Sequence, residues 1–481
     1  MSTDPFRSAS DLAAAVRSGD VSPVDLVDSY LDRIESRGDH TTAFVTVVEE
    51  SARERAREAE RAVEAGEYLG PLHGVPVAIK DLADAKAGVR HTFGMKPLAD
   101  NVADRTTVGV ERLEAAGAIV VGTTNTPELG HTVRTLNELV GPTATPFDAD
   151  YNAGGSSGGS AAALADGLCA LATGSDVGGS LRTPAACCNV ASVKPTFGLV
   201  PRDARPDAFR GHTPFGVLGP MARTVDDLAL ALDVLAGQDD RDPYSVPKPD
   251  EYADATDASA DEFTVGYSPD LDRFPVEPAV RETVGDALDA LSSAGATVEE
   301  VSVGGPERGD LVYAYGVTAT TLFATVVREM NEARGMDLLA DHAEDLSPTF
   351  EQTVRMGQGG DAVEYTTRDV TRTAWYDAVE DALEGNDALV CPALATPPLT
   401  HDEPLPTEID GQSVGGLPMD WALSWPFNLT GHPVVTVPAG LVDGLPVGLQ
   451  IVTRRFDERT GLGIAAAFED ANPWADRYPD A

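Results

Sequence analysis

The sequence predicts an α/β fold, in which helices cover both faces of a β-sheet. Amphipathic helical segments and short apolar runs typical of buried strands alternate along the chain. The chain has 481 residues, more than a typical single domain. Hydrophobic residues make up 42% of it, which is ample for a large core and argues against general disorder.

The first half of the chain supplies most of this alternation. Apolar side chains at helical spacing, or a composition that favours helix, predict helices over residues 8–36 (broken at Ser22–Pro23), 50–66, 106–117 and 161–172. Apolar runs predict strands over residues 75–80, 116–125, 189–193 and 215–219. In the first of these strands Val75, Val77 and Ile79 alternate with smaller residues, and Lys80 stands at its end.

The second half begins with a change of composition. Residues 238–262 are rich in Asp and Pro, so we interpret them as a solvated connector. The strands expected beyond it are 263–267, 297–301, 387–392, 433–440 and 446–452, and the expected helices are 277–293, segments within 311–384, and 458–470. The region 311–384 has few recognisable motifs, and we expect substrate selection there.

Two turns rich in glycine and serine are the most distinctive local feature. The first, Gly154–Ser160, precedes a segment of small helix-forming residues, so its serines are expected near a helix N-terminus with outward-facing N–H groups. The second, Gly174–Ser180, repeats the arrangement. Successive N–H groups from Val177 to Ser180 are suited to binding a negatively charged oxygen.

Three motifs, in this order and at these intervals, carry a resemblance to a known family. They are Lys80–Asp81 in GVPVAIKD, Ser156 in GGSSGGS and Ser180 in GSDVGGSLR. In these motifs the chain resembles the amidase signature family, and the likeness continues over most of 70–237 and again over 425–455. The resemblance implies a core built on a large mixed β-sheet covered by helices on both faces.

The resemblance also implies a catalytic unit. Ser180 corresponds to the nucleophile, Ser156 to a bridging serine that follows a cis peptide bond, and Lys80 to the base. The residues expected to bind the oxyanion or the substrate are Val177, Gly178 and Gly179. Those expected to support the site are Ser157, Ser175, Asp176 and Arg182.

The chemistry of these residue types agrees with those roles. A serine hydroxyl is a poor nucleophile at pH 7, so it needs a proton acceptor. A lysine can accept a proton only when it is neutral, which requires burial among apolar neighbours or nearby positive charge. Lys80 ends an apolar strand, where burial is expected, although Asp81 beside it is a group that would favour the charged form.

The function implied is the hydrolysis of a carboxylic amide to the acid and ammonia through an acyl-enzyme on Ser180. Two alternatives stay open: an A-type subunit of glutamyl-tRNA amidotransferase, and a non-catalytic amide- or peptide-binding member of the fold. The transamidation subunit usually has glutamine where this chain has Thr183, which favours a stand-alone amidase. The GGSSG turn also fits the G-x-S-x-G elbow of α/β-hydrolases, but residues 146–153 before it are interpreted as a turn rather than the strand this motif requires.

The regions of the chain then divide as follows: an N-terminal helical segment (1–70), the core with the catalytic residues (71–237), the acidic connector (238–262), a variable, mostly helical, substrate-selecting region (263–385), and C-terminal strands and a helix that complete the core (386–481).

The net charge of the chain limits the kinds of partner it can bind. There are 78 acidic and 35 basic residues, with a net charge of −43, so the chain is expected to repel nucleic acid and anionic membranes. Only five lysines are present, and acidic residues are spread over the whole length, which suggests a surface adapted to high salt.

No leader-like segment or metal-ligand spacing of cysteines is found in the sequence. We expect a cytoplasmic enzyme with a small-molecule amide substrate and neither metal nor organic cofactor. A homodimer is compatible with the sequence. The sequence does not select among aliphatic, aryl and peptide amides.

Overall fold

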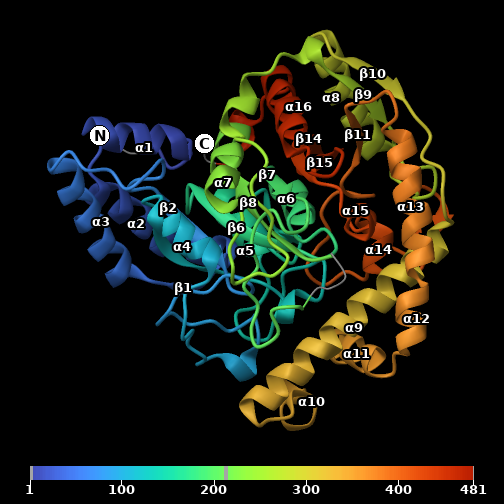
Figure 1. The fold of residues 1–481 in the computed structure, drawn as a ribbon, viewed down its shortest axis with the longest axis horizontal. Helices are drawn as coiled ribbons and strands as arrows, with labels where there is room; N and C mark the ends of the chain where they lie inside the picture. The colour runs from blue at the N-terminus through green and yellow to red at the C-terminus, as the bar shows by residue number, and fades with distance from the viewer. Residues whose placement is uncertain (1–3, 211–214, 480–481) are drawn as a thin grey trace.

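The described part of the chain is built around a mixed β-sheet of eleven strands (Figure 1). The computed structural model describes residues 4–210 and 215–479. The strand order is β1-β3-β2-β6-β8-β7-β14-β15-β11-β9-β10. The strands are β1 Phe44–Val47, β2 Pro76–Lys80, β3 Ile119–Thr124, β6 Leu171–Asp176, β7 Ala191–Lys194, β8 Val217–Ala222, β9 Thr264–Tyr267, β10 Thr297–Glu300, β11 Ala388–Pro392, β14 Val434–Val442 and β15 Leu445–Val452.

The helices lie on both sides of this sheet, as the sequence predicts. They are α1 Ala9–Ser18, α2 Pro23–Thr41, α3 Glu49–Glu64, α4 Val108–Ala115, α5 Gly158–Ala165, α6 Arg182–Cys188, α7 Val225–Leu235, α8 Pro278–Ser293, α9 Arg308–Arg334, α10 Leu338–Asp341, α11 Pro348–Gln358, α12 Ala362–Thr367, α13 Asp369–Ala382, α14 Pro418–Trp421, α15 Pro426–Thr430 and α16 Glu458–Ala471. Helices α5 and α6 pack together on one face, and α7, α8 and α16 pack together on the other.

The two ends of the sheet carry different helices (Figure 1). Helices α1 to α3 lie at one end, and α9 to α13 lie at the other, where α9, α10 and α11 extend away from the sheet. The two ends of the described chain lie close together, since Phe6 and Tyr478 stack with ring centroids 5.6 Å apart.

The break predicted at Ser22–Pro23 is confirmed, and its local cause is clear. Gly19 ends α1 with a φ of 78°, in the left-handed region that favours glycine. Ser22 then accepts hydrogen bonds from the N–H groups of Val24 and Asp25, and Pro23 occupies the first helical position of α2.

Strand β2 explains why Lys80 is buried. All five of its side chains are buried, and it pairs in parallel with β3 on one side and β6 on the other. Because a central parallel strand is covered on both faces, its sequence is a continuous apolar run. Lys80 ends that run and is 0% exposed.

Three predictions of local structure are wrong. The helix expected over 161–172 ends at Ala165, and Leu171–Asp176 form the buried strand β6. Residues 146–153 are not simply a turn, because β5 (Asp148–Asn152) pairs with β4 (Ala144–Thr145) in a separate two-stranded ribbon. The connector 238–262 is not fully solvated, since Tyr252 is 1% exposed.

One described helix, α9, is long and apolar enough to cross a membrane by length and composition alone. Its apolar residues include Leu322, Phe323, Val326 and Met330, which line a cavity of the protein. The apolar composition of α9 is therefore explained in part by its place on the cavity wall.

Candidate active site

The amine of Lys80 lies among three serine hydroxyls. Its Nζ is 2.8 Å from Oγ of Ser156, 2.9 Å from Oγ of Ser157 and 3.0 Å from Oγ of Ser175. An ammonium can donate to all three hydroxyls, whereas a neutral amine can donate to two and accept a proton from the third. The structure therefore brings Lys80 together with the predicted bridging serine and two of the predicted supporting residues.

Burial favours the neutral form of this amine. It lowers the pKa of Lys80 from the usual 10.5 to about 7, against the opposing effect of the Asp176 and Asp84 carboxylates. At neutral pH a substantial fraction of molecules therefore carries a lysine that can accept a proton. A group poised in this way is suited to general-base catalysis.

The two nearby aspartates bond to threonines. The Asp81 carboxylate accepts hydrogen bonds from the N–H and Oγ1 of Thr92, and the Asp84 carboxylate accepts one of 2.6 Å from Oγ1 of Thr173. The hydrogen bonds of the Lys80 amine to described residues go to serine hydroxyls and not to either carboxylate. Burial raises the pKa of Asp81 to about 7 and that of Asp84 to about 6. The sequence-based concern that Asp81 holds Lys80 charged is thus not supported.

Ser156 stands between strand β5 and helix α5. The Gly155–Ser156 peptide bond is cis, as the family resemblance implies. Gly158, two positions later, is packed too tightly for a side chain, because an added β-carbon would lie 2.3 Å from Oγ1 of Thr135. Ser156 is 2% exposed, so its hydroxyl reaches outward only through the cavity that it lines.

Ser180 follows the turn after β6, and its backbone ties the two serine loops together. Its carbonyl accepts a hydrogen bond of 3.1 Å from the N–H of Ser157. Its hydroxyl makes no hydrogen bond with any described residue, including Ser156. Both serines line the same cavity. Catalytic hydrogen bonds often tighten only in the complex with substrate, so this geometry is compatible with the bridging role.

In the predicted oxyanion loop, one backbone N–H group is bonded to a described residue and three are not, which leaves these three free to bind an oxyanion. The N–H of Gly179 donates to the Asp176 carboxylate at 2.8 Å. The N–H groups of Val177, Gly178 and Ser180 have no acceptor within the described parts of the chain. These three, rather than Gly179, are the donors that the loop offers to an oxyanion.

A buried ion pair fixes the shape of this loop. Arg182 donates from Nε and Nη2 to the two oxygens of Asp176, each at 3.0 Å, and both side chains are fully buried. Burial alone would raise the pKa of Asp176, but Arg182 and Asn428 outweigh it and hold this pKa well below its usual range. The structure thus gives Asp176 and Arg182 the supporting position that the sequence predicts.

Two residues from a distant part of the chain also hold Arg182, and the sequence motifs did not indicate them. Arg182 also donates to Oδ1 of Asn428 at 2.7 Å and to Oε1 of Gln450 at 2.9 Å. Both Asn428 and Gln450 lie within 425–455, the second stretch of family resemblance. That resemblance was the one feature of the sequence that could have indicated their role.

A cavity of about 670 Å³ opens onto the two serine loops. Ser156, Ser175, Val177 and Ser180 form one wall. The apolar side chains of α9 form part of another wall, which agrees with the expectation that residues 311–384 take part in selecting the substrate.

Tyr315 of α9 is a further neighbour that the sequence did not single out. A β-carbon added at Gly178 would lie 1.9 Å from the hydroxyl oxygen of Tyr315, so this hydroxyl sits directly over the oxyanion loop. The ring packs between Phe215 and Trp425, with centroids 5.4 and 5.2 Å away. Gly178 is therefore required by the close approach of a side chain from another region.

Comparison with known proteins gives the family. The family model described as Amidase matches residues 25–462. The chain belongs to the amidase signature family. It is 36% identical to an acylamidase of Rhodococcus erythropolis, over 98% of this chain and 97% of that protein. It is also 33% identical to the A-type subunit of the glutamyl-tRNA(Gln) amidotransferase of Thermosynechococcus vestitus, over 95% of this chain and 96% of the relative.

Solved structures agree with this membership. The crystal structure of a bacterial aryl acylamidase of the same family superimposes with a TM-score of 0.92 at 33% identity, covering 98% of each chain. The large mixed sheet that the resemblance implied is thus confirmed. The family model and the relatives together identify the chain as an amidase.

Proposed function

We propose that this amidase hydrolyses a linear amide, R–CO–NH₂, to the carboxylic acid and ammonia through an acyl-enzyme on Ser180. The observation that carries the proposal is the buried Lys80 amine, 2.8 Å from Oγ of Ser156 and with a pKa lowered by burial to about 7. Acyl transfer needs a nucleophile, a base and donors for the oxyanion. Ser180, Ser156 and Val177 line one cavity, and the buried Lys80 reaches it through Ser156.

The first half of the reaction forms the acyl-enzyme. Oγ of Ser180 attacks the carbonyl carbon while its proton passes to Oγ of Ser156, whose own proton passes to the neutral amine of Lys80. N–H groups of Val177, Gly178 and Ser180 stabilise the oxyanion. As the C–N bond breaks, the proton returns from Lys80 through Ser156 to the departing nitrogen, and ammonia leaves.

Water completes the cycle by the same route. It attacks the ester of Ser180, and its proton passes through Ser156 to Lys80. Collapse of the second tetrahedral intermediate breaks the ester bond, returns the proton to Oγ of Ser180 and releases the acid. These steps form and break C–O and C–N bonds and transfer protons, but none changes an oxidation state, so the proposed chemistry needs no redox partner.

We propose a stand-alone amidase in preference to a transamidation subunit. Thr183 supports this choice, because its Oγ1 lies 3.2 Å from Oγ of Ser424 in a fully buried position where the transamidation subunit usually has a larger glutamine. We further propose that the enzyme is cytoplasmic and, on the strength of its net charge, adapted to high salt.

The test is covalent trapping. Purified protein in high salt is incubated with amides of varied R groups, ammonia release is measured, and quenched samples are analysed by mass spectrometry for an acyl adduct. We expect an adduct on the peptide that contains Ser180, and no ammonia release by Ser180→Ala. The matched control is Ser36→Ala, an exposed serine on α2. Undiminished turnover by the Ser180 variant, or an adduct on Ser156, would contradict the proposal.

A further inference from the structure

The cavity reverses the charge balance of the chain. Five arginines line it but only three acidic residues do, whereas the whole chain has more than twice as many acidic as basic residues. The arginines are Arg105, Arg202, Arg205, Arg210 and Arg334. A positive cavity in a strongly acidic protein favours an anionic ligand over a neutral one.

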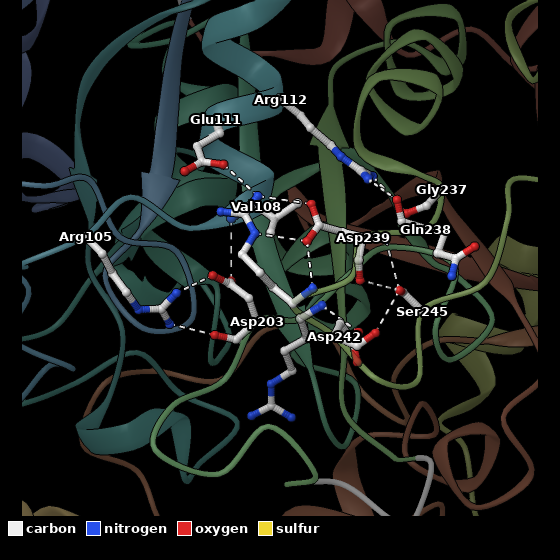
Figure 2. Close-up of polar contacts among 12 residues, drawn as sticks. Arg105, Val108, Glu111, Arg112, Asp203, Gly237, Gln238, Asp239, Asp242 and Ser245 are labelled. Atoms are coloured by element: carbon white, nitrogen blue, oxygen red, sulfur yellow. Dashed lines mark hydrogen bonds and ion pairs between the residues drawn. The ribbon is translucent and has the colours of Figure 1, made fainter.

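Four of these arginines have acceptors inside the protein. Arg105 points at the carboxylate and carbonyl of Asp203 (Figure 2), and Arg210 pairs with Glu329. Arg205 donates to the carbonyl of Ala204, and Arg334 donates to Oδ1 of Asn101. The guanidinium of Arg202 has neither a hydrogen-bond acceptor nor a carboxylate partner among the described residues.

Arg202 stands close to the oxyanion loop. A β-carbon added at Gly216 would lie 3.1 Å from Nη1 of Arg202 and 3.2 Å from Cγ2 of Val177, so the guanidinium and Val177 flank the same point. The backbone of Arg202 is held in place, since its N–H donates to the Asp242 carboxylate at 2.8 Å. The unpaired guanidinium therefore extends from an anchored backbone on the cavity wall.

The neighbouring carboxylates are engaged elsewhere. Asp203 binds Arg105 (Figure 2). Asp242 accepts hydrogen bonds from the backbone N–H groups of Arg202 and Tyr244. Burial, and then the positive charge of Arg210, lower the pKa of Arg202 to about 10, so it remains protonated at neutral pH. The planar fork of a guanidinium matches a carboxylate, to which it donates two parallel hydrogen bonds.

We propose that Arg202 binds a carboxylate in the acyl part of the substrate, so that the preferred substrates are half-amides of dicarboxylic acids, ⁻OOC–(CH₂)n–CO–NH₂. This proposal rests on the amide hydrolysis proposed above, and it assigns Arg202 as a specificity-determining residue. The length n that fits is set by the distance from the guanidinium to Ser180.

Paired substrates test this proposal. Each half-amide with three to six carbons is compared with a neutral partner in which an acetyl group replaces the carboxylate, for example succinamate with 4-oxopentanamide. We expect the wild type to have a higher kcat/KM for the anionic partner at one preferred length. Arg202→Gln should lower the ratio of the two kcat/KM values on the order of 10- to 100-fold, mainly through KM. Arg202→Lys should retain part of the ratio.

The control variant is Arg328→Gln, which changes the net charge equally. Arg328 lies on α9, pairs with Glu332 and has an 81% exposed side chain. It should leave the ratio unchanged. If Arg202→Gln does not fold, free dicarboxylates are tested as competitive inhibitors of 4-oxopentanamide hydrolysis by the wild type, where competition supports the site.

The outcomes separate the two proposals. Hydrolysis of neutral amides with no preference for the half-amides, a ratio unchanged by Arg202→Gln, or an absence of competition by dicarboxylates would overturn the role of Arg202 alone. Failure to hydrolyse any amide would instead overturn the proposed function on which it rests.

Discussion

Replacing Asp84 by asparagine should move the acid limb of the pH–rate profile to lower pH. With a pKa of about 7, Lys80 is neutral in about half of the molecules at pH 7, whereas a lysine with a pKa of 10.5 would be neutral in roughly one molecule in 3,000. The Asp84 carboxylate acts in the opposite direction, since it favours the ammonium form. Asp84→Asn removes that charge, so Lys80 should stay neutral to lower pH.

The size of the effect follows from the charge that is removed. An opposite charge within about 4–6 Å commonly changes the pKa of its neighbour by about one unit or more. Asp84 is linked to Lys80 through Thr173, whose Oγ1 donates to the carboxylate and accepts a hydrogen bond from the backbone N–H of Lys80. If kcat/KM follows the neutral fraction of Lys80, a shift of about one unit makes the variant retain up to roughly fivefold more of its maximal rate at pH 6 than the wild type. The gain is below this limit because Asp84, with a pKa of about 6, is already partly protonated at that pH.

The assay is kcat/KM for one amide, measured by ammonia release from pH 5 to 9 at constant ionic strength, because this parameter reports pKa values of the free enzyme. Asp81→Asn is the matched control, since the buried Asp81 carboxylate is bonded to Thr92 and is not among the charges that act on Lys80. A wild-type limb near pH 10, or an Asp84→Asn limb that is unmoved or displaced upward, would refute the reasoning.

Three further perturbations probe the loop and the surface. Arg182→Met should reduce the free energy of unfolding by about 3–5 kcal/mol in a denaturant titration, because it leaves the buried Asp176 carboxylate without its partner; unchanged stability would contradict this role. Gly178→Ala should abolish most of the turnover, because its β-carbon would overlap the hydroxyl of Tyr315. Partial recovery is expected in Gly178→Ala/Tyr315→Ala, and no recovery would place the defect elsewhere. The melting temperature should rise from low to molar KCl as salt screens the net charge of −43, and a flat profile would argue against salt adaptation.

The residues that were predictable from the sequence are those whose signal is local. Lys80 ends an apolar strand, and Ser156 and Ser180 each stand in a turn rich in glycine. These local motifs carry the resemblance to the amidase signature family, and it is this resemblance that implied the three residues lie together. Strand β6 was missed because residues 161–172, which include its first two residues, are rich in Ala and Leu, and these favour helix. Its position between β2 and β8, in the interior of the sheet, overrides that preference.

The rest of the site depends on contacts between distant segments. Tyr315 lies over Gly178, and Asn428 and Gln450 bond to Arg182, at separations of more than 130 residues. No periodicity along the chain reports such contacts. The same holds for the Gly179 N–H, since only the fold shows that Asp176 occupies it and leaves its neighbours free.

The protonation state of Lys80 can be observed directly by NMR. The chain has five lysines, so protein labelled with ¹³C and ¹⁵N in lysine alone gives few signals, and the signal of Lys80 is the one that Lys80→Met removes. We expect this signal to titrate near pH 7. A Lys80 that stays protonated up to pH 9 could not accept the proton of a serine, and that result would contradict the mechanism.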